Sequence, residues 1–146
     1  MTSIERAKPA DRAAIETLLV AADLPLTGLE LAIATAVVAR DGEAIVGCAA
    51  IEPYGSAGLL RSVAVTEALR GSGLGRRLVV EAEAFAAKSG IETLFLLTET
   101  AEEWFPRLGY SASTRSTVPA TLAASPEFTD ACPESAAVFR KYIAAG

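Results

Sequence analysis

A glycine-rich turn between an apolar segment and an amphipathic segment constrains the fold of this chain more than any other feature. The turn reads Arg70-Gly71-Ser72-Gly73-Leu74-Gly75-Arg76-Arg77. Residues 59–65 before it are largely apolar and predict a buried strand, and residues 78–86 after it place apolar side chains at helical spacing. A strand, a tight turn and a helix in this order indicate an α/β fold.

The same turn is suited to hold an anion. Successive glycines let backbone N–H groups point into one concavity, and the N-terminus of the following helix adds partial positive charge. Arg70, Arg76 and Arg77 add full charges. A P-loop needs Lys and a hydroxyl residue after its last glycine, and a dinucleotide fingerprint needs glycine where Arg76 stands. The turn therefore indicates a phosphate or pyrophosphate site of another kind, the alternative being a connector that binds nothing.

The rest of the chain alternates between strand and helix patterns. Strands are expected at residues 4–8, 36–40, 44–52, 59–65 and 93–97, and helices at 9–23, 29–34, 75–89 and 99–108. The Asp41-Gly42 pair predicts a hairpin between the second and third strands. Two further segments, 112–118 and 136–144, complete a mixed α/β sheet. We expect one domain over residues 1–146.

Composition excludes several classes of function. The net charge is −5, from 18 acidic and 13 basic residues, which argues against a partner nucleic acid. We expect no membrane span, because no apolar run is long enough, and no signal peptide, because the N-terminus is charged; the predicted localisation is cytoplasmic. Without histidine, a His-based zinc site or triad is excluded, and we expect no metal. Cys48 and Cys132 leave binding of trivalent arsenic as a minor alternative.

The turn and its flanks resemble a known family. Arg70-x-x-Gly73-x-Gly75, after a strand ending Val63-Ala64-Val65, resembles the acetyl-CoA signature Gln/Arg-x-x-Gly-x-Gly/Ala of the GNAT acetyltransferases. Later residues resemble the family's downstream pattern, namely Thr98, Ala101, Phe105, Gly109 and Tyr110. The resemblance implies the GNAT fold: a mixed, mostly antiparallel sheet, splayed between strands 4 and 5 and flanked by about four helices. It also implies acetyl-CoA as co-substrate, and it is compatible with a homodimer.

The resemblance also assigns residues to acetyl-CoA. By position, the Val63 N–H polarises the thioester carbonyl, and Val65 bonds the pantetheine arm. The full set of residues that the resemblance places at acetyl-CoA is Val63, Val65, Arg70, Gly71, Ser72, Gly73, Leu74, Gly75, Arg76, Thr98, Ala101 and Phe105.

Two departures from the family pattern concern proton transfer. Leu59 stands where some members have a carboxylate base, and Phe105 stands where many have a Tyr acid. Glu99, just past a strand end, is a candidate proton relay, and its alternative is a solvated carboxylate that favours a helix dipole. The acceptor amine could also deprotonate to water. The loss of both usual residues keeps open a non-catalytic acyl-CoA-binding or regulatory protein.

Arg61 is the first candidate for binding the acceptor. A charged residue inside an apolar strand is costly unless it is paired, and a guanidinium binds a carboxylate or oxyanion bidentately. Period-2 alternation places Arg61 on the same face as Leu59 and Val63. The alternative is a salt bridge with Glu52. Arg115 is a second candidate for substrate binding.

A narrower resemblance concerns the acceptor. Residues 59–65, residues 96–98 and the tail from Glu127-Phe128 through Cys132-Pro133 resemble a GNAT subgroup encoded in arsenic-resistance operons. That resemblance implies an acceptor such as an amino-acid analogue bearing an arsinate or phosphinate. The predicted function is therefore N-acetylation of a small amine, amino-acid-like or xenobiotic, with a role in arsenic resistance.

Overall fold

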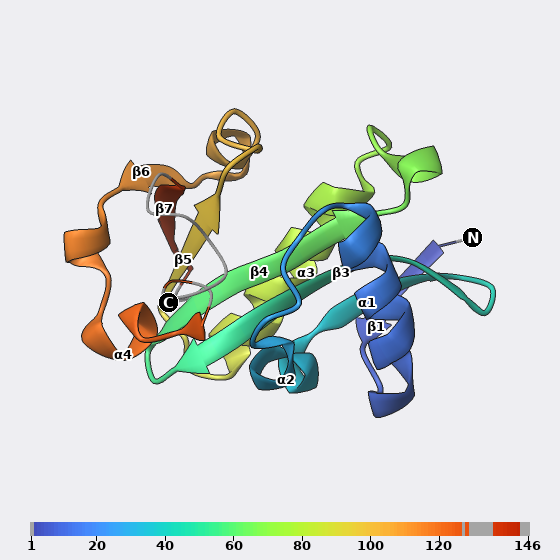
Figure 1. The fold of residues 1–146 in the computed structure, drawn as a ribbon, viewed down its shortest axis with the longest axis horizontal. Coiled ribbons are helices and arrows are strands. Elements are labelled where there is room, and N and C mark those ends of the chain that lie inside the picture. Colours follow the sequence, from blue (N-terminus) through green and yellow to red (C-terminus); the bar gives the residue numbers. More distant parts are fainter. Residues whose placement is uncertain (1, 127, 129–135, 144–146) are drawn as a thin grey trace.

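The computed structural model describes residues 2–126, 128 and 136–143, and in them a seven-stranded sheet forms the centre of the fold (Figure 1). The order across the sheet is β1-β2-β3-β4-β5-β7-β6. The strands are β1 (Thr2–Arg6), β2 (Val37–Asp41), β3 (Ala44–Tyr54), β4 (Ala57–Val65), β5 (Thr93–Thr98), β6 (Ser111–Ser113) and β7 (Ala137–Tyr142). The predicted hairpin at Asp41-Gly42 is confirmed, and Gly42 has the positive φ of 65° that such a turn needs.

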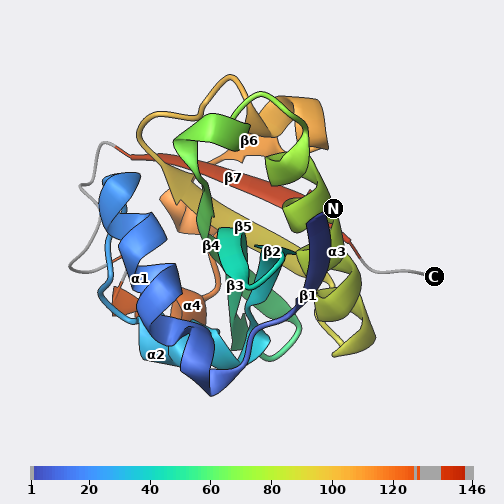
Figure 2. The same cartoon turned by 90° about the vertical axis from the view of Figure 1, so that its right-hand side faces the viewer.

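Helices cover both faces of this sheet (Figure 2). The described α-helices are α1 (Arg12–Ala21), α2 (Leu29–Ala32), α3 (Leu74–Lys88) and α4 (Ala120–Ala123), and short 3-10 turns are η1 (Pro9–Asp11), η2 (Ile33–Thr35), η3 (Glu67–Leu69), η4 (Phe105–Leu108) and η5 (Arg115–Thr117). In Figure 2 the sheet stands edge-on between α1 and α2 on one side and α3 on the other. The sheet is thus buried on both faces.

The expected helix over residues 99–108 is wrong. Only η4 forms there, after a series of turns. Pro106 has no N–H to donate to a carbonyl four residues earlier, so an α-helix cannot continue through it. The Thr98 hydroxyl instead accepts a hydrogen bond from the Ala101 N–H at 3.0 Å, which closes a turn directly after β5. The segment becomes a loop that folds back over the end of the sheet.

The sheet opens between β4 and β5. Their parallel pairing covers only Ala57↔Thr93, Gly58↔Leu94 and Leu59↔Phe95, although β4 continues to Val65. The other strand pairs are antiparallel. The predicted fold is confirmed: a mixed, mostly antiparallel sheet that is splayed between its fourth and fifth strands.

A β-bulge at Ser62 changes which way β4 faces. Ala50 pairs with Arg61 and Cys48 pairs with Ala64, so one residue of β3 opposes two of β4, and Ser62 has a φ of 59°. After the bulge, Val63 packs with Leu60 in the core under α3, because the extra residue reverses the alternation. Arg61 therefore faces away from Val63, and the expectation that the two share a face is wrong.

Close packing holds α3 on the sheet. Leu78 is fully buried there, and a Cβ built on Gly47 of β3 would lie 2.7 Å from its Cδ1 atom. Glycine at position 47 thus allows the helix to approach the strand. This contact matters for function because α3 begins at the glycine-rich turn.

Candidate active site

A cleft of about 770 Å³ opens where β4 and β5 diverge. Its floor is the end of β4, residues 60–65, and its walls are the glycine-rich turn, the end of β5 with the loop after it, and residues 21–24 after α1. Segments far apart in the sequence therefore meet at one opening in the sheet.

The free edge of β4 presents backbone amides to this cleft. The Thr66 N–H donates to the Val46 carbonyl of β3 at 2.9 Å. Because backbone groups of successive strand residues point to opposite edges, Val65 and, two residues earlier, Val63 direct their N–H groups toward the edge that β5 has left. The Val65 carbonyl accepts a hydrogen bond from Arg70 Nε at 3.2 Å, which ties the turn to the strand.

The glycine-rich turn leaves the start of α3 open. Gly71 and Gly73 have φ values of 82° and 88°, a region that only glycine adopts freely. Gly73 is the N-cap of α3, and no side chain caps the helix. A Cβ on Gly75 would lie 3.3 Å from Trp104 Cζ2, so glycine there lets the ring pack against the turn. The first-turn amides thus form an anion-binding concavity.

Most residues that the sequence places at acetyl-CoA line this cleft. They are Val63, Val65, Arg70, Gly71, Gly73, Gly75, Arg76, Thr98, Ala101 and Phe105. Ser72 and Leu74 are not among its lining residues: the Ser72 hydroxyl donates to the Leu69 carbonyl at 2.5 Å, and the Leu74 side chain is buried in the core. Only the backbone of these two could reach a ligand.

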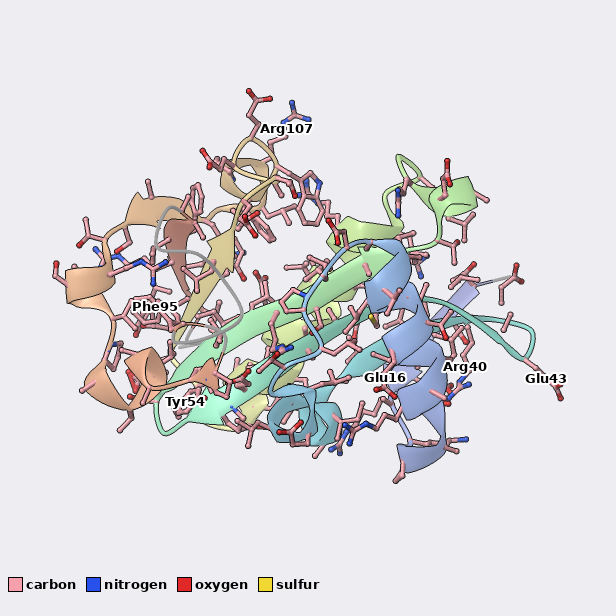
Figure 3. All side chains as sticks on the ribbon, viewed as in Figure 1. Glu16, Arg40, Glu43, Tyr54, Phe95 and Arg107 are labelled. Atoms are coloured by element: carbon pink, nitrogen blue, oxygen red, sulfur yellow. The ribbon has the colours of Figure 1, made fainter. Side chains whose placement is uncertain are left out.

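Sequence reasoning missed the far wall of the cleft. Trp104, Arg107 and Leu108 line it, as do residues 21–24. Figure 3 shows Arg107 on the loop at one end of the molecule, remote from Tyr54 at the other end of the sheet. Trp104 is the one tryptophan of the chain and directly precedes Phe105, which is a signal that could have drawn attention to it.

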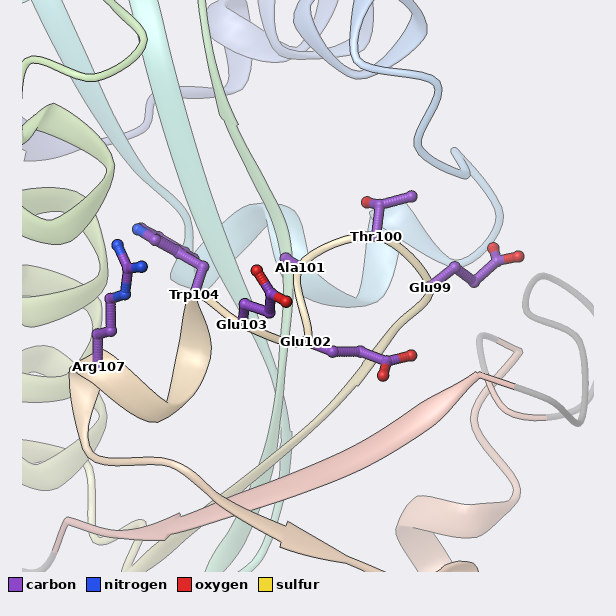
Figure 4. Close-up of a pocket in the computed structure, with 7 residues that line it drawn as sticks. All are labelled: Glu99, Thr100, Ala101, Glu102, Glu103, Trp104 and Arg107. Carbon is purple, nitrogen blue, oxygen red and sulfur yellow. The ribbon is translucent and has the colours of Figure 1, made fainter.

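Glu99 and Arg115 lie outside the cleft. Glu99 lines a neighbouring pocket of about 590 Å³, formed by the loop after β5. Figure 4 shows it at the opposite end of that loop from Trp104 and Arg107. The Arg115 guanidinium lies 5.4 Å from the centre of the Phe128 ring and borders neither space. Their proposed roles remain predictions.

Arg61 borders the cleft but is held in a buried polar network. Its Nη1 atom donates to Glu52 Oε2 at 2.7 Å, the ion pair that was the alternative to substrate binding. The guanidinium also donates to the carbonyls of Pro25 and Thr27 and to the Ser62 hydroxyl. Arg61 thus fastens the loop between α1 and α2 to the bulge in β4.

The other oxygen of Glu52 extends this network toward α4. Its Oε1 atom accepts hydrogen bonds from the hydroxyls of Tyr54 and Ser125, at 2.5 and 2.7 Å. Burial and the hydrogen bond to Glu52 raise the pKa of Tyr54. Glu52 is fully buried, so its charge depends on these partners.

Cys48 is a buried thiol, as its strand position predicts. Its Sγ atom donates to the Ser62 carbonyl at 3.1 Å, and burial raises its pKa from 9.0 to about 12. Thiolates bind trivalent arsenic, and the thiol form does so poorly. Cys132 lies outside the described residues, as does the tail that carried the arsenic resemblance apart from Phe128.

We expect Cys48 to resist alkylation in the native protein. In a Cys132→Ser background at pH 8, iodoacetamide should modify Cys48 at least 10-fold more slowly than after unfolding, because its pKa is raised and it is buried. The raised pKa of Cys48 also makes the stability of the fold depend on pH. Its contribution is fully present below pH 9, the ordinary pKa of the thiol, and is lost as the pH rises through about 12. Mass spectrometry measures the rates, and equal rates would contradict the burial.

Tyr110 is a core residue. It is buried, and its hydroxyl donates to Glu83 Oε2 at 2.8 Å, while burial raises its pKa.

Across the described ranges, no helix is long and apolar enough to cross a membrane. The same residues contain no group of three or more His, Cys, Asp or Glu side chains arranged for a metal ion.

A splayed sheet with an uncapped helix at its opening defines a GNAT-type domain, and sequence comparison agrees. The family model described as acetyltransferase (GNAT) domain matches residues 32–112, more than half of the chain. The chain belongs to the GNAT family.

Curated relatives carry related names. The chain is 38% identical over 85 residues to an amino-acid acetyltransferase of Ralstonia nicotianae, which covers 57% of this chain and 19% of that protein. It is 40% identical over 67 residues to an uncharacterized N-acetyltransferase of Chlorobaculum tepidum, covering 45% and 43% of the two chains. The chain thus spans about a fifth of the length of the named amino-acid acetyltransferase.

Solved structures share the whole fold. N-acetylglutamate synthase from Neisseria gonorrhoeae, complexed with coenzyme A and N-acetyl-glutamate, superposes with a TM-score of 0.85 at 22% identity, covering 99% of this chain and 36% of that one. A Mycobacterium tuberculosis protein in complex with CoA superposes with a TM-score of 0.79 at 24% identity, covering 96% and 98%. At these identities the likeness concerns the fold.

Proposed function

We propose that this protein is an acetyl-CoA-dependent N-acetyltransferase that acts on the amine of a small, amino-acid-like molecule. The observation that carries the proposal is the cleft itself, where free amides of β4 lie beside the uncapped N-terminus of α3. A thioester on a pyrophosphate-bearing arm matches both features, because the helix end binds the anion and the strand edge binds an extended chain.

The residues present fit acetyl-CoA. Amides of the turn, residues 71–76, would hold the pyrophosphate, and Arg70, Arg76 and Arg107 supply positive charge around it. The Val65 N–H would bond the pantetheine arm, and Phe105 would pack against that arm. The bound thioester supplies an activated acetyl group.

The chain's own groups would then orient the thioester and polarise its carbonyl. The Val63 N–H points to the free edge of β4 and would donate to the thioester carbonyl, stabilising the charge that develops on its oxygen. Phe105 is buried at the position of the family's usual acid and has no proton to give. Proton transfer must therefore use another group or water, with Glu99 as the relay that the sequence predicts.

An amino-acid-like acceptor is supported by the names of the relatives. Arg61 borders the cleft and is the contact that the sequence predicts for the acceptor's carboxylate; its buried guanidinium would have to exchange Glu52 for the acceptor to make that contact. Arg115 is a weaker second choice, because it lies outside the cleft. A role in arsenic resistance, with arsinate or phosphinate analogues as acceptors, and a homodimer remain part of the proposal on the family resemblance alone.

The decisive experiment pairs binding with turnover. Titration with acetyl-CoA should raise the melting temperature, and chromatography should detect CoA released with an amine panel of amino acids and phosphinate analogues. Absence of stabilisation would refute the proposal. Stabilisation by acetyl-CoA without release of CoA in the presence of any amine would favour the acyl-CoA-binding alternative. A rise in melting temperature with arsenite alone would favour the metalloid-binding alternative.

A glycine substitution tests the cofactor side of the cleft. We expect Gly73→Val to weaken acetyl-CoA binding at least 10-fold, because a β-branched residue cannot hold a φ of 88° without distorting the turn. Gly42→Val is the matched control: its φ of 65° is equally unfavourable, a Cβ meets nothing within 4 Å at either site, and it lies in the β2–β3 hairpin, which does not line the cleft. Calorimetry should show that the control binds acetyl-CoA with unchanged affinity. Equal losses of affinity in the two variants would contradict the assignment of Gly73 to the acetyl-CoA site.

A further inference from the structure

The charges around the cleft are unevenly distributed. Among the described residues that line it, the cations are Arg61, Arg70, Arg76 and Arg107, and the carboxylate is Asp23. None of the lining residues is a Lys, Tyr or Cys, and the chain has no His. Asp23 is thus the single carboxylate among the described residues that line the cleft, and a carboxylate is the kind of group that can act as a general base.

The backbone at Asp23 is unusual. Its φ is 58°, and Ser62, also in the cleft, is the other described non-glycine residue with positive φ. Asp23 lies just past the C-terminus of α1. Its N–H donates to the Val20 carbonyl at 3.1 Å, and the next N–H, that of Leu24, donates to the Leu19 carbonyl at 2.9 Å. Glycine is the usual residue at such a helix end, so an acidic side chain is kept there at some cost in stability.

The buried network holds the loop that follows Asp23 against the end of β4. Figure 1 shows the loop after α1 passing over β4 on its way to α2. Arg61 fastens that loop through the Pro25 and Thr27 carbonyls, at 3.2 and 2.7 Å. Residues 21–24 and the end of β4 therefore border the same cleft, so that Val63 and the exposed Asp23 both line it.

We propose that the Asp23 carboxylate binds the ammonium group of the acceptor and takes its proton, an inference that rests on the proposed function. The ammonium gives one proton to Asp23, and the neutral nitrogen forms a C–N bond to the acetyl carbon as the C–S bond breaks. The nitrogen's second proton goes to the departing thiolate, and Asp23 releases its proton to solvent. One amide, one CoA thiol and one proton result.

Asp23 replaces Glu99 as the proton acceptor in this scheme. Glu99 lines the neighbouring pocket and not the cleft. The charged groups that share the cleft with Asp23 are the four arginines, which stay protonated through the accessible pH range. A change in the pH profile between pH 6 and 10 would therefore come from the acceptor amine.

The test uses two replacements that the backbone tolerates. Asp23→Asn keeps the size and the left-handed preference, and Asp23→Gly adopts a φ of 58° without strain. We expect both to retain the acetyl-CoA Kd within twofold and to lose about 100-fold in kcat/KM for the amine at pH 7. The deficit should shrink toward pH 10, where the amine is already neutral. Glu43→Gln, which changes an exposed carboxylate in the β2–β3 hairpin outside the cleft, is the control and should stay within twofold of wild type.

Each other outcome counts against the proposal. Wild-type turnover in both Asp23 variants would overturn it while leaving the acetyltransferase function intact. A parallel loss of acetyl-CoA affinity would assign Asp23 to the cofactor instead. A deficit that is constant with pH would remove the proton-accepting role. If the wild-type protein binds acetyl-CoA but acetylates no amine, both the proposed function and this inference fail.

Discussion

Glu52→Gln should lower the free energy of unfolding by about 3–5 kcal/mol, the cost of leaving a buried charge without its partner. Arg61 is only 3% exposed and Glu52 is fully buried, so water cannot replace the lost carboxylate. The hydroxyls of Tyr54 and Ser125 would lose a charged acceptor as well. Urea unfolding measures the loss.

A double variant separates charge from shape in this prediction. Glu52→Leu with Arg61→Met removes both charges and fills a similar volume, so the part of the stability lost to the unpaired charge should return. The part that comes from the hydroxyls of Tyr54 and Ser125 should not return, because they still lack an acceptor. Activity should not return, because the carbonyls of Pro25 and Thr27 lose the donor that fastens the loop bearing Asp23. If the double variant is no more stable than Glu52→Gln, the pair is not the reason for the loss.

The sequence predicts that Arg61→Ala weakens turnover and spares acetyl-CoA binding. The network adds a loss of stability, since Glu52 would then be the unpaired buried charge. Measuring kcat/KM, acetyl-CoA affinity and unfolding on the same variant distinguishes these effects. Loss of acetyl-CoA affinity in protein that remains folded would contradict the placement of Arg61 on the acceptor side.

The second large effect is expected at the contact between α3 and the sheet. Leu78→Ala should cost about 2–5 kcal/mol, because Leu78 is fully buried and its removal leaves a cavity under the helix. Acetyl-CoA affinity should fall in the same variant, since α3 carries the glycine-rich turn at its start. Chemical unfolding and calorimetry check the two parts.

A compensating substitution makes this prediction specific. Gly47→Ala alone should destabilise by about 1–3 kcal/mol, because its Cβ would lie 2.7 Å from Leu78 Cδ1. In the Leu78→Ala background the clash with Leu78 disappears and the added methyl partly fills the cavity, while the Ala64 carbonyl oxygen remains 3.3 Å from that methyl. The double variant should therefore be more stable than the sum of the single losses predicts. Strict additivity would show that the two residues do not share this contact.

Local features of the sequence determined the part of the site that we propose to bind acetyl-CoA. Gly71 and Gly73 are glycines because of their φ values, and the apolar periods on either side identify the strand and the helix that the turn joins. These properties belong to short stretches of chain, and periodicity and glycine spacing report them directly. The hairpin at Asp41-Gly42 and the buried Tyr110 could be predicted for similar reasons.

Only the tertiary structure decided how the acceptor side is built. The bulge at Ser62 depends on the register of β3 against β4, and it turned Arg61 away from Val63 and toward Glu52. The loop after β5 is not a helix, partly because Thr98 closes a turn there. Asp23 enters the cleft because a loop from another part of the chain is fastened across β4. Such features arise from pairing between distant segments, and no local pattern of residues records which segments will meet.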